Sequence, residues 1–206
     1  MSWIWWPALC VGLTLCFYWA RVIKLVLKAK ARGESANFFP PEPIGRLIRA
    51  IWYPTVVVWC LLPLYLAFHR PDLAPFRPLF HQPIIAWLAT LACLAILGLT
   101  MVCWRKMGRE WRMGIDPNEK NNLLVTGPYA YVRHPIYALQ QLLAIASAIA
   151  VPVPLMIVIA GLEVVLLSWE AIREEQHLSH VHGQTYRDYM RTAGRFWPRL
   201  TRAGGR

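Results

Sequence analysis

Long apolar runs separated by short polar segments dominate the chain. They cover about 3–20, 50–68, 84–104, 136–151 and 153–169 and are almost free of charged residues. A helix that crosses the hydrocarbon core of a bilayer needs about 20 such residues. The last two runs are short, and Pro152 and Pro154 lie between them, where a missing backbone donor interrupts a helix. The pattern predicts an all-α integral membrane protein with about five transmembrane helices, the last two forming a tight hairpin.

Composition agrees with this pattern, because 57% of the residues are hydrophobic and only 16% are charged. No internal repeat or low-complexity linker indicates a second soluble domain. We therefore expect residues 1–206 to form a single membrane domain, with three spans in 1–104 and the chemistry in 105–206. The first run opens on Trp3, Trp5 and Trp6 without a basic segment before it or a cleavage signature after it, which favours a retained helix over a signal peptide.

The net charge of +11 comes from 22 lysine and arginine residues. All of them except Arg70 and Arg77 fall in three stretches of the chain. These stretches fall within 21–49, 105–133 and 173–206, which are alternate loops of a five-span chain. By the positive-inside rule the N-terminus is outside and the C-terminus is cytoplasmic. Nucleic acid is not needed to explain the charge, since no basic helix or aromatic platform of a known reader is present.

The segment 127–137, GPYAYVRHPIY, places tyrosines, an Arg-His pair and two prolines between two long apolar segments. Gly127-Pro128 predicts a turn, and Pro135 suits the first turn of the following helix. His134 then lies beside the free backbone donors and the positive end of the helix dipole, a position suited to an anionic group. Tyr131, Arg133, His134 and Tyr137 could alternatively serve only as anchors at the headgroup level.

A dense acidic cluster, EAIREEQHL, follows at 170–178. Glu170, Arg173 and Glu174 are spaced i, i+3 and i+4, so they share a helix face and can pair as an ordinary surface salt bridge. The cluster leaves the membrane on the same side as the 127–137 segment. We therefore expect the two clusters to meet there and to form a functional site.

A metal site is not expected at His177, His180 and His182, which lie at the end of this cluster and just after it. Glu174, His177 and His180 are separated by about 300° of helix rotation, at about 100° per residue, so they do not point to one centre. His182 does not complete the set, and solvated or headgroup-facing histidines are expected instead.

The 127–137 segment and the downstream acidic pair resemble a known family. GPYAYVRHPIY, the Glu174-Glu175 pair, and then Leu178, Gly183, Tyr186, Tyr189 and Trp197-Pro198 are similar to the C-terminal signature of the isoprenylcysteine carboxyl methyltransferase and phospholipid methyltransferase superfamily. The resemblance covers about 105–198, and the first three spans match only in number and topology. It implies an enzyme that uses S-adenosylmethionine, bound by membrane helices and a C-terminal cytoplasmic cap.

The resemblance also implies which residues bind the cofactor and what kind of molecule accepts the methyl group. The cofactor-binding residues are expected to be Tyr131, His134, Pro135, Tyr137, Glu174 and Glu175. The acceptor is expected to be a lipophilic small molecule or a lipid that enters between helices. A sulfonium is already a strong methyl donor, so such an enzyme has to align the acceptor and exclude water.

Three acceptor chemistries are open at this point, and a carboxylate is expected first. A carboxylate would be held by Arg173 or Arg133, because a guanidinium binds it bidentately and no base is needed. The amine of a phospholipid must lose a proton, and Glu170 would be the base. A thiol would need a nearby cation. Two further classes are a nicotinamide-dependent membrane reductase, whose additional cofactor contacts are not found in the sequence, and a non-enzymatic membrane scaffold.

Overall fold

The computed structural model describes residues 5–32, 43–69, 71–108 and 123–199. They form five α-helices: α1 (Trp5–Ala31), α2 (Pro43–Phe68), α3 (Pro83–Met107), α4 (Pro135–Ala150) and α5 (Pro154–Thr192), with short 3₁₀ turns η1 (Ala74–Phe76) and η3 (Gly127–Ala130). The described residues contain no β-strand, only an isolated parallel bridge between Val132 and Gly194. The prediction of an all-α membrane fold is confirmed.

The helices match the predicted runs in number and order, but several differ in length. α1 continues to Ala31 and α2 already begins at Pro43, so both extend into the basic segments that were expected to be loops. By length and composition, α1, α2, α3 and α5 can each cross a membrane, whereas α4 has only 16 residues. Most of the third basic loop, 109–122, lies outside the described residues.

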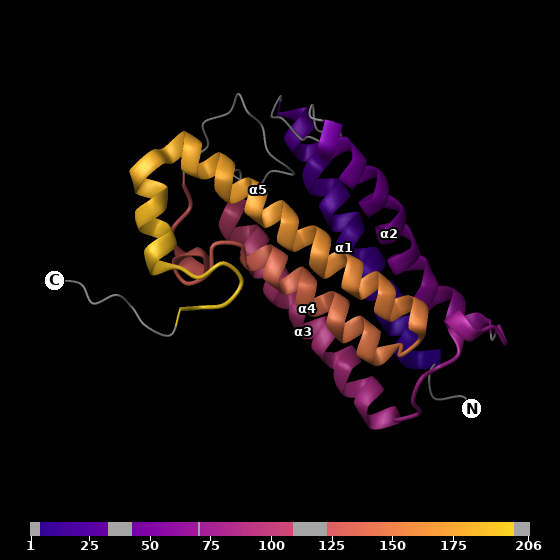
Figure 1. Ribbon diagram of the computed structural model, residues 1–206. Helices are drawn as coiled ribbons and strands as arrows, with labels where there is room; N and C mark the ends of the chain where they lie inside the picture. The colour runs from indigo at the N-terminus through magenta and orange to yellow at the C-terminus, as the bar shows by residue number, and fades with distance from the viewer. Residues whose placement is uncertain (1–4, 33–42, 70, 109–122, 200–206) are drawn as a thin grey trace.

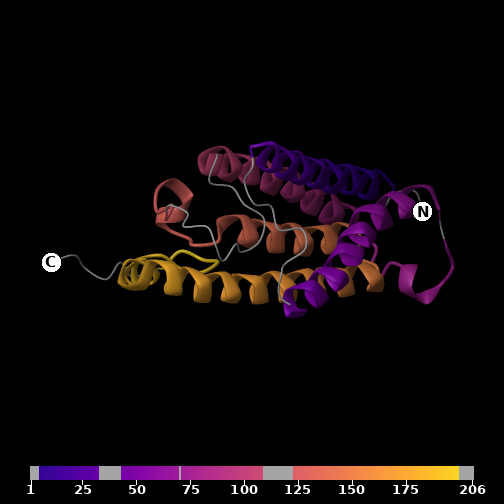
Figure 2. The same cartoon turned by 90° about the horizontal axis from the view of Figure 1, so that it is seen from above.

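The helices form a bundle in which α3 packs on α1 and α4, α2 packs on α1 and α5, and α4 packs on α5. Figures 1 and 2 show the helices extending along the length of the bundle, with the hairpin of α4 and α5 beside the first three helices. Large apolar side chains cover the outer faces, including Ile84, Leu88 and Val165, which are 74%, 61% and 64% exposed. Such a surface fits lipid and not water, because in a bilayer these side chains meet an apolar medium.

The C-terminal part of α5 forms a cap at one end of the bundle. Gly183 interrupts the helix with φ +55° and ψ −124°, a conformation that glycine alone adopts readily. Beyond it the helix turns across the bundle end where α4 begins (Figure 1). Backbone hydrogen bonds from Arg133 N to Gly194 O (2.8 Å) and from Gly194 N to Tyr131 O (3.0 Å) join the cap to the 127–137 segment.

Candidate functional site

Glu175 lies at the centre of an ion cluster between the 127–137 segment and the cap. Arg133 donates to its Oε1 through Nε (2.9 Å) and NH2 (2.7 Å). Arg195 donates to its Oε2 through Nε (3.0 Å) and NH2 (2.6 Å), and these hydrogen bonds raise the pKa of Arg195. Four charge-assisted donors keep the buried carboxylate ionised.

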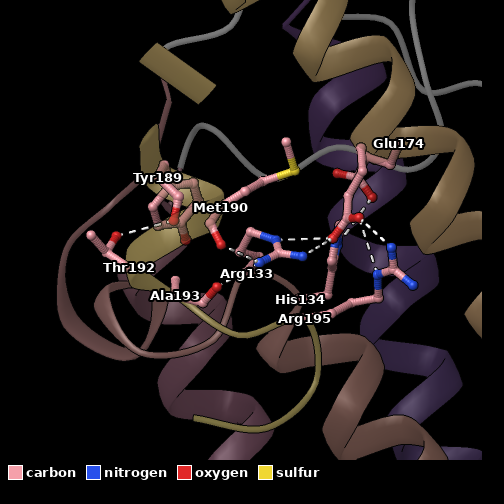
Figure 3. Close-up of polar contacts among 9 residues, drawn as sticks. Arg133, His134, Glu174, Tyr189, Met190, Thr192, Ala193 and Arg195 are labelled. Atoms are coloured by element: carbon pink, nitrogen blue, oxygen red, sulfur yellow. Dashed lines mark hydrogen bonds and ion pairs between the residues drawn. The ribbon is translucent and has the colours of Figure 1, made fainter. Parts of the chain in front are cut away.

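Arg133 also fixes the turn that follows α5. Its NH1 donates to the carbonyl oxygens of Met190 and Ala193, so one guanidinium binds both the carboxylate and the backbone of the cap (Figure 3). The predicted meeting of the 127–137 segment with the acidic cluster is therefore confirmed. The sequence did not indicate the contribution of Arg195, which had been counted only as a cytoplasmic cation.

His134 is the N-cap residue of α4, and Pro135 occupies the first helical position as predicted. The imidazole is buried, with Nδ1 3.6 Å from Glu174 Oε2 and Nε2 3.4 Å from Glu175 Oε1. The ring stacks on Tyr137 with 5.4 Å between ring centroids. The backbone N–H of His134 itself donates to the carbonyl oxygen of Arg195 (3.1 Å), which joins the start of α4 to the cap.

A cavity of about 90 Å³ opens beside His134, between the ends of α1, α2 and α3 and the start of α4. Four of the predicted cofactor residues line it: His134, Pro135, Tyr137 and Glu174. The other two do not: Tyr131 is 55% exposed, and Glu175 is bound by the two arginines. A molecule as large as S-adenosylmethionine needs more room, so its binding requires cavity side chains to move.

Much of the remaining cavity wall is aromatic. Tyr18 and Trp104 lie with ring centroids 5.0 Å apart, and Trp19 and Trp52 with centroids 5.9 Å apart. Tyr129, which belongs to the 127–137 segment, completes the wall. Burial raises the pKa of its hydroxyl, which stays protonated and donates to Met107 Sδ (3.3 Å).

Arg49 lines the cavity and was not predicted as a site residue. Its side chain is 4% exposed, and NH2 lies 3.0 Å from Glu170 Oε1. Arg173 NH1 lies 3.3 Å from Glu170 Oε2, which confirms the predicted pairing within α5. Glu170 is thus shared by two guanidinium groups. The sequence could not show this, because Arg49 was assigned to a loop and lies 121 residues from Glu170 along the chain.

A second group that was missed lies deeper in the bundle. Glu163 is fully buried, and its Oε2 accepts hydrogen bonds from Trp52 Nε1 (3.0 Å) and Gln140 Nε2 (3.2 Å). Gln140 Oε1 in turn accepts one from the hydroxyl of Tyr18 (3.0 Å). The signal was available, since an acidic residue inside an apolar run is a functional candidate by default.

Among the described residues, His177, His180 and His182 of α5 belong to no candidate metal site. Within the described residues, no three His, Cys, Asp or Glu side chains are placed to share an ion.

The protein is thus an all-α, membrane-type helix bundle with a polar and aromatic cavity at its capped end. Residues 84–185 match the family model for phospholipid methyltransferases. The predicted resemblance to the superfamily that includes these methyltransferases is confirmed.

A curated relative is the nickel-cobalt-cadmium resistance protein NccN of Alcaligenes xylosoxydans xylosoxydans. The two are 30% identical over 114 residues, which is 55% of this chain and 52% of that protein. The match therefore spans about half the length of the relative.

Proposed function

We propose that the protein transfers a methyl group from S-adenosylmethionine to a lipophilic acceptor at the membrane. The sulfonium supplies the methyl group: its carbon–sulfur bond breaks, the electron pair remains on sulfur, and S-adenosylhomocysteine leaves. The lone pair of the acceptor forms the new bond to carbon. The residues of the chain then have to orient the two molecules and keep water out. The single observation that carries this proposal is the cavity lined by His134 and Glu174, two residues of the matched region 84–185.

The predicted cofactor residues differ in whether they line the cavity. His134, Tyr137 and Glu174 line the cavity and can contact the cofactor directly. Glu175 is bound by Arg133 and Arg195, so we assign it the role of holding the cap in place over the cavity. Tyr131 is on the surface and would contact only a cofactor part that extends from the cavity.

An apolar groove offers room for the acceptor chain. It has a volume of about 300 Å³, lies between α1 and α2, and shares Trp19 and Val22 with the first cavity. A chain lying in this groove would present its polar head to the cavity. The position of this groove next to the cavity supports a lipophilic acceptor that approaches from the side of the bundle.

A carboxylate and a phospholipid amine are the two acceptor classes that we carry forward. The arginines predicted to hold a carboxylate, Arg133 and Arg173, each contact a glutamate of α5. The family description favours the amine. Glu170, predicted as the base for an amine, forms ion pairs with Arg49 and Arg173.

Calorimetric titration of the detergent-purified protein with S-adenosylmethionine and S-adenosylhomocysteine tests the proposal. We expect micromolar binding that weakens roughly tenfold or more in His134→Ala and in Glu174→Gln, because each removes a polar contact from a desolvated site. Asp188→Asn is the matched control, since Asp188 lies on the exposed side of the cap and its side chain pairs with Arg191. A folded wild-type protein that binds neither compound would refute the proposed function.

A further inference from the structure

Three side chains in the wall of the cavity beside His134 have a buried nitrogen without a hydrogen-bond partner among the described residues. The three atoms are NH1 of Arg49 and the indole Nε1 atoms of Trp19 and Trp104. Arginine and tryptophan side chains donate hydrogen bonds but accept none. Buried donors are rarely left unpaired, because each one then loses its hydration without a replacement. The wall therefore has donors for the oxygen atoms of a ligand.

Arg49 is the charged member of this set, and its guanidinium group is fixed by two other contacts. Its central carbon lies 4.4 Å from the centroid of the Trp52 ring, and NH2 donates to Glu170 Oε1 (3.0 Å). Glu170 does not bind Arg49 with both oxygens, because its Oε2 contacts Arg173 NH1 (3.3 Å). A fixed guanidinium group that keeps one terminal nitrogen for a ligand is suited to a further anionic oxygen.

The two arginines that were first expected to hold a carboxylate lie elsewhere. Arg133 donates to Glu175 and to the backbone of the cap through all three of its guanidinium nitrogens. Arg173 contacts Glu170, and its guanidinium carbon lies 4.7 Å from the centroid of the Trp169 ring. Neither arginine lines the cavity, whereas Arg49 does. Arg49 also precedes the matched region 84–185, so the family model does not assign it a role.

The donors and the acidic residue of the cavity belong to different parts of its wall. Glu174 lies beside His134, with 3.6 Å between its Oε2 and the imidazole Nδ1, at the start of α4. Trp19 and Arg49 belong to α1 and α2, and Trp19 also lines the apolar groove between these two helices. A ligand that contacts Trp19 and Arg49 therefore lies where the cavity meets the groove.

We propose that Arg49, Trp19 and Trp104 bind an anionic oxygen group of an amphiphile whose hydrocarbon chain lies in the groove. Arg49 supplies the positive charge, the two indoles supply neutral hydrogen bonds, and the groove buries the chain. Arg49 is thereby a residue that determines specificity, because it selects an anionic amphiphile over a neutral one. The inference rests on the proposed function, since it names the charge by which the acceptor is held.

Isothermal titration calorimetry of the detergent-purified protein measures this selection. The probes are dodecanoate, dodecyl phosphate and dodecanol, which share one chain length and differ in the head group. They are added below micellar concentration in a neutral detergent, at a pH that keeps dodecanoate ionised. We expect the wild-type protein to bind the anions roughly tenfold more tightly than dodecanol, because a charge-assisted hydrogen bond in a desolvated site contributes that much. The anion that binds more tightly shows whether the site takes a carboxylate or a phosphate.

Two variants assign the preference to the donors. Arg49→Gln removes the charge and keeps a polar side chain, so we expect anions and dodecanol to bind equally well. Trp104→Phe keeps an aromatic ring without the N–H group, and should weaken binding of the anions alone by about threefold to tenfold. Trp87→Phe is the matched control, because Trp87 is 43% exposed on the same helix, α3, and does not line the cavity.

Dodecanol that binds the wild-type protein as tightly as both anions overturns the inference. An anion preference retained in folded Arg49→Gln overturns it as well. If Arg49→Gln does not fold, the wild-type titration and Trp104→Phe decide, because the second variant leaves every ion pair in place.

Titration with S-adenosylmethionine separates this inference from the proposed function. A wild-type protein that binds the cofactor but shows no anion preference refutes only the charge assigned to the acceptor, whereas one that binds no cofactor refutes the proposed function. We expect Arg49→Gln to bind S-adenosylmethionine as the wild type does. Loss of that affinity would place the carboxylate of the cofactor at Arg49 and would overturn the assignment of this site to the acceptor.

Discussion

Three glutamates on α5 differ in how their charge is balanced. Glu175 is bound by Arg133 and Arg195 at the cap, and Glu170 is shared by Arg49 and Arg173 at the cavity. Glu163 has only neutral donors. Since removing one member of a buried ion pair leaves the other uncompensated, Glu175 and Glu170 are expected to matter for stability.

Glu175→Gln is expected to lower the free energy of unfolding by about 3–5 kcal/mol, because it leaves the buried guanidinium of Arg133 without its countercharge. Thermal unfolding followed by intrinsic fluorescence in detergent measures the change. Asp188→Asn, whose ion pair with Arg191 is exposed, should change the free energy by less than about 1 kcal/mol. Equal midpoints for the two variants would contradict a structural role for the Glu175 cluster.

At the scale of the element, α5 has two different functions along its 39 residues. Its first part is apolar enough to cross a membrane, and its last part leaves the bundle as the cap. Gly183 makes the change of direction possible, because its positive φ and its ψ of −124° are strained for any residue with a Cβ. The position of the cap over the α4 N-terminus therefore depends on one glycine.

Gly183→Ala is expected to destabilise the cap by about 1–3 kcal/mol and to weaken cofactor binding, because the 193–197 segment would no longer be held against His134. Gly161→Ala in the same helix is the control: a Cβ there meets no atom within 4 Å, and alanine is the better helix former. Hydrogen exchange of the cap and calorimetry check both effects. Unchanged protection of 184–197 in the first variant would rule out this role for Gly183.

For the whole molecule, the distribution of charge predicts how the bundle lies in the membrane. Basic residues end α1 and α3, at Lys28, Lys30, Arg105 and Lys106, and the capped end carries more. Because cytoplasmic loops are enriched in lysine and arginine, we propose that the cap and the cavity face the cytoplasm and that the N-terminus is outside.

Reporter fusions test this orientation. A green fluorescent protein fused after residue 206 should fluoresce, and an alkaline phosphatase fused there should be inactive, because the first folds in the cytoplasm and the second only outside it. Insertion of the same reporters near Asp72, at the opposite end of the bundle, should give the reverse pattern. An active phosphatase at the C-terminus would contradict the proposed topology.

The sequence by itself determined the all-α membrane class, the number and order of the helices, the start of α4 at Pro135 and the meeting of the 127–137 segment with the acidic cluster. These features depend on local composition and on neighbouring spans, which a one-dimensional pattern records. Only the tertiary structure decided which buried polar groups face one another. Arg49 meets Glu170, and Tyr18 meets Gln140, across 121 and 122 residues of chain. Such pairs arise from how helix faces pack, and an apolar pattern without an alignment does not specify that packing.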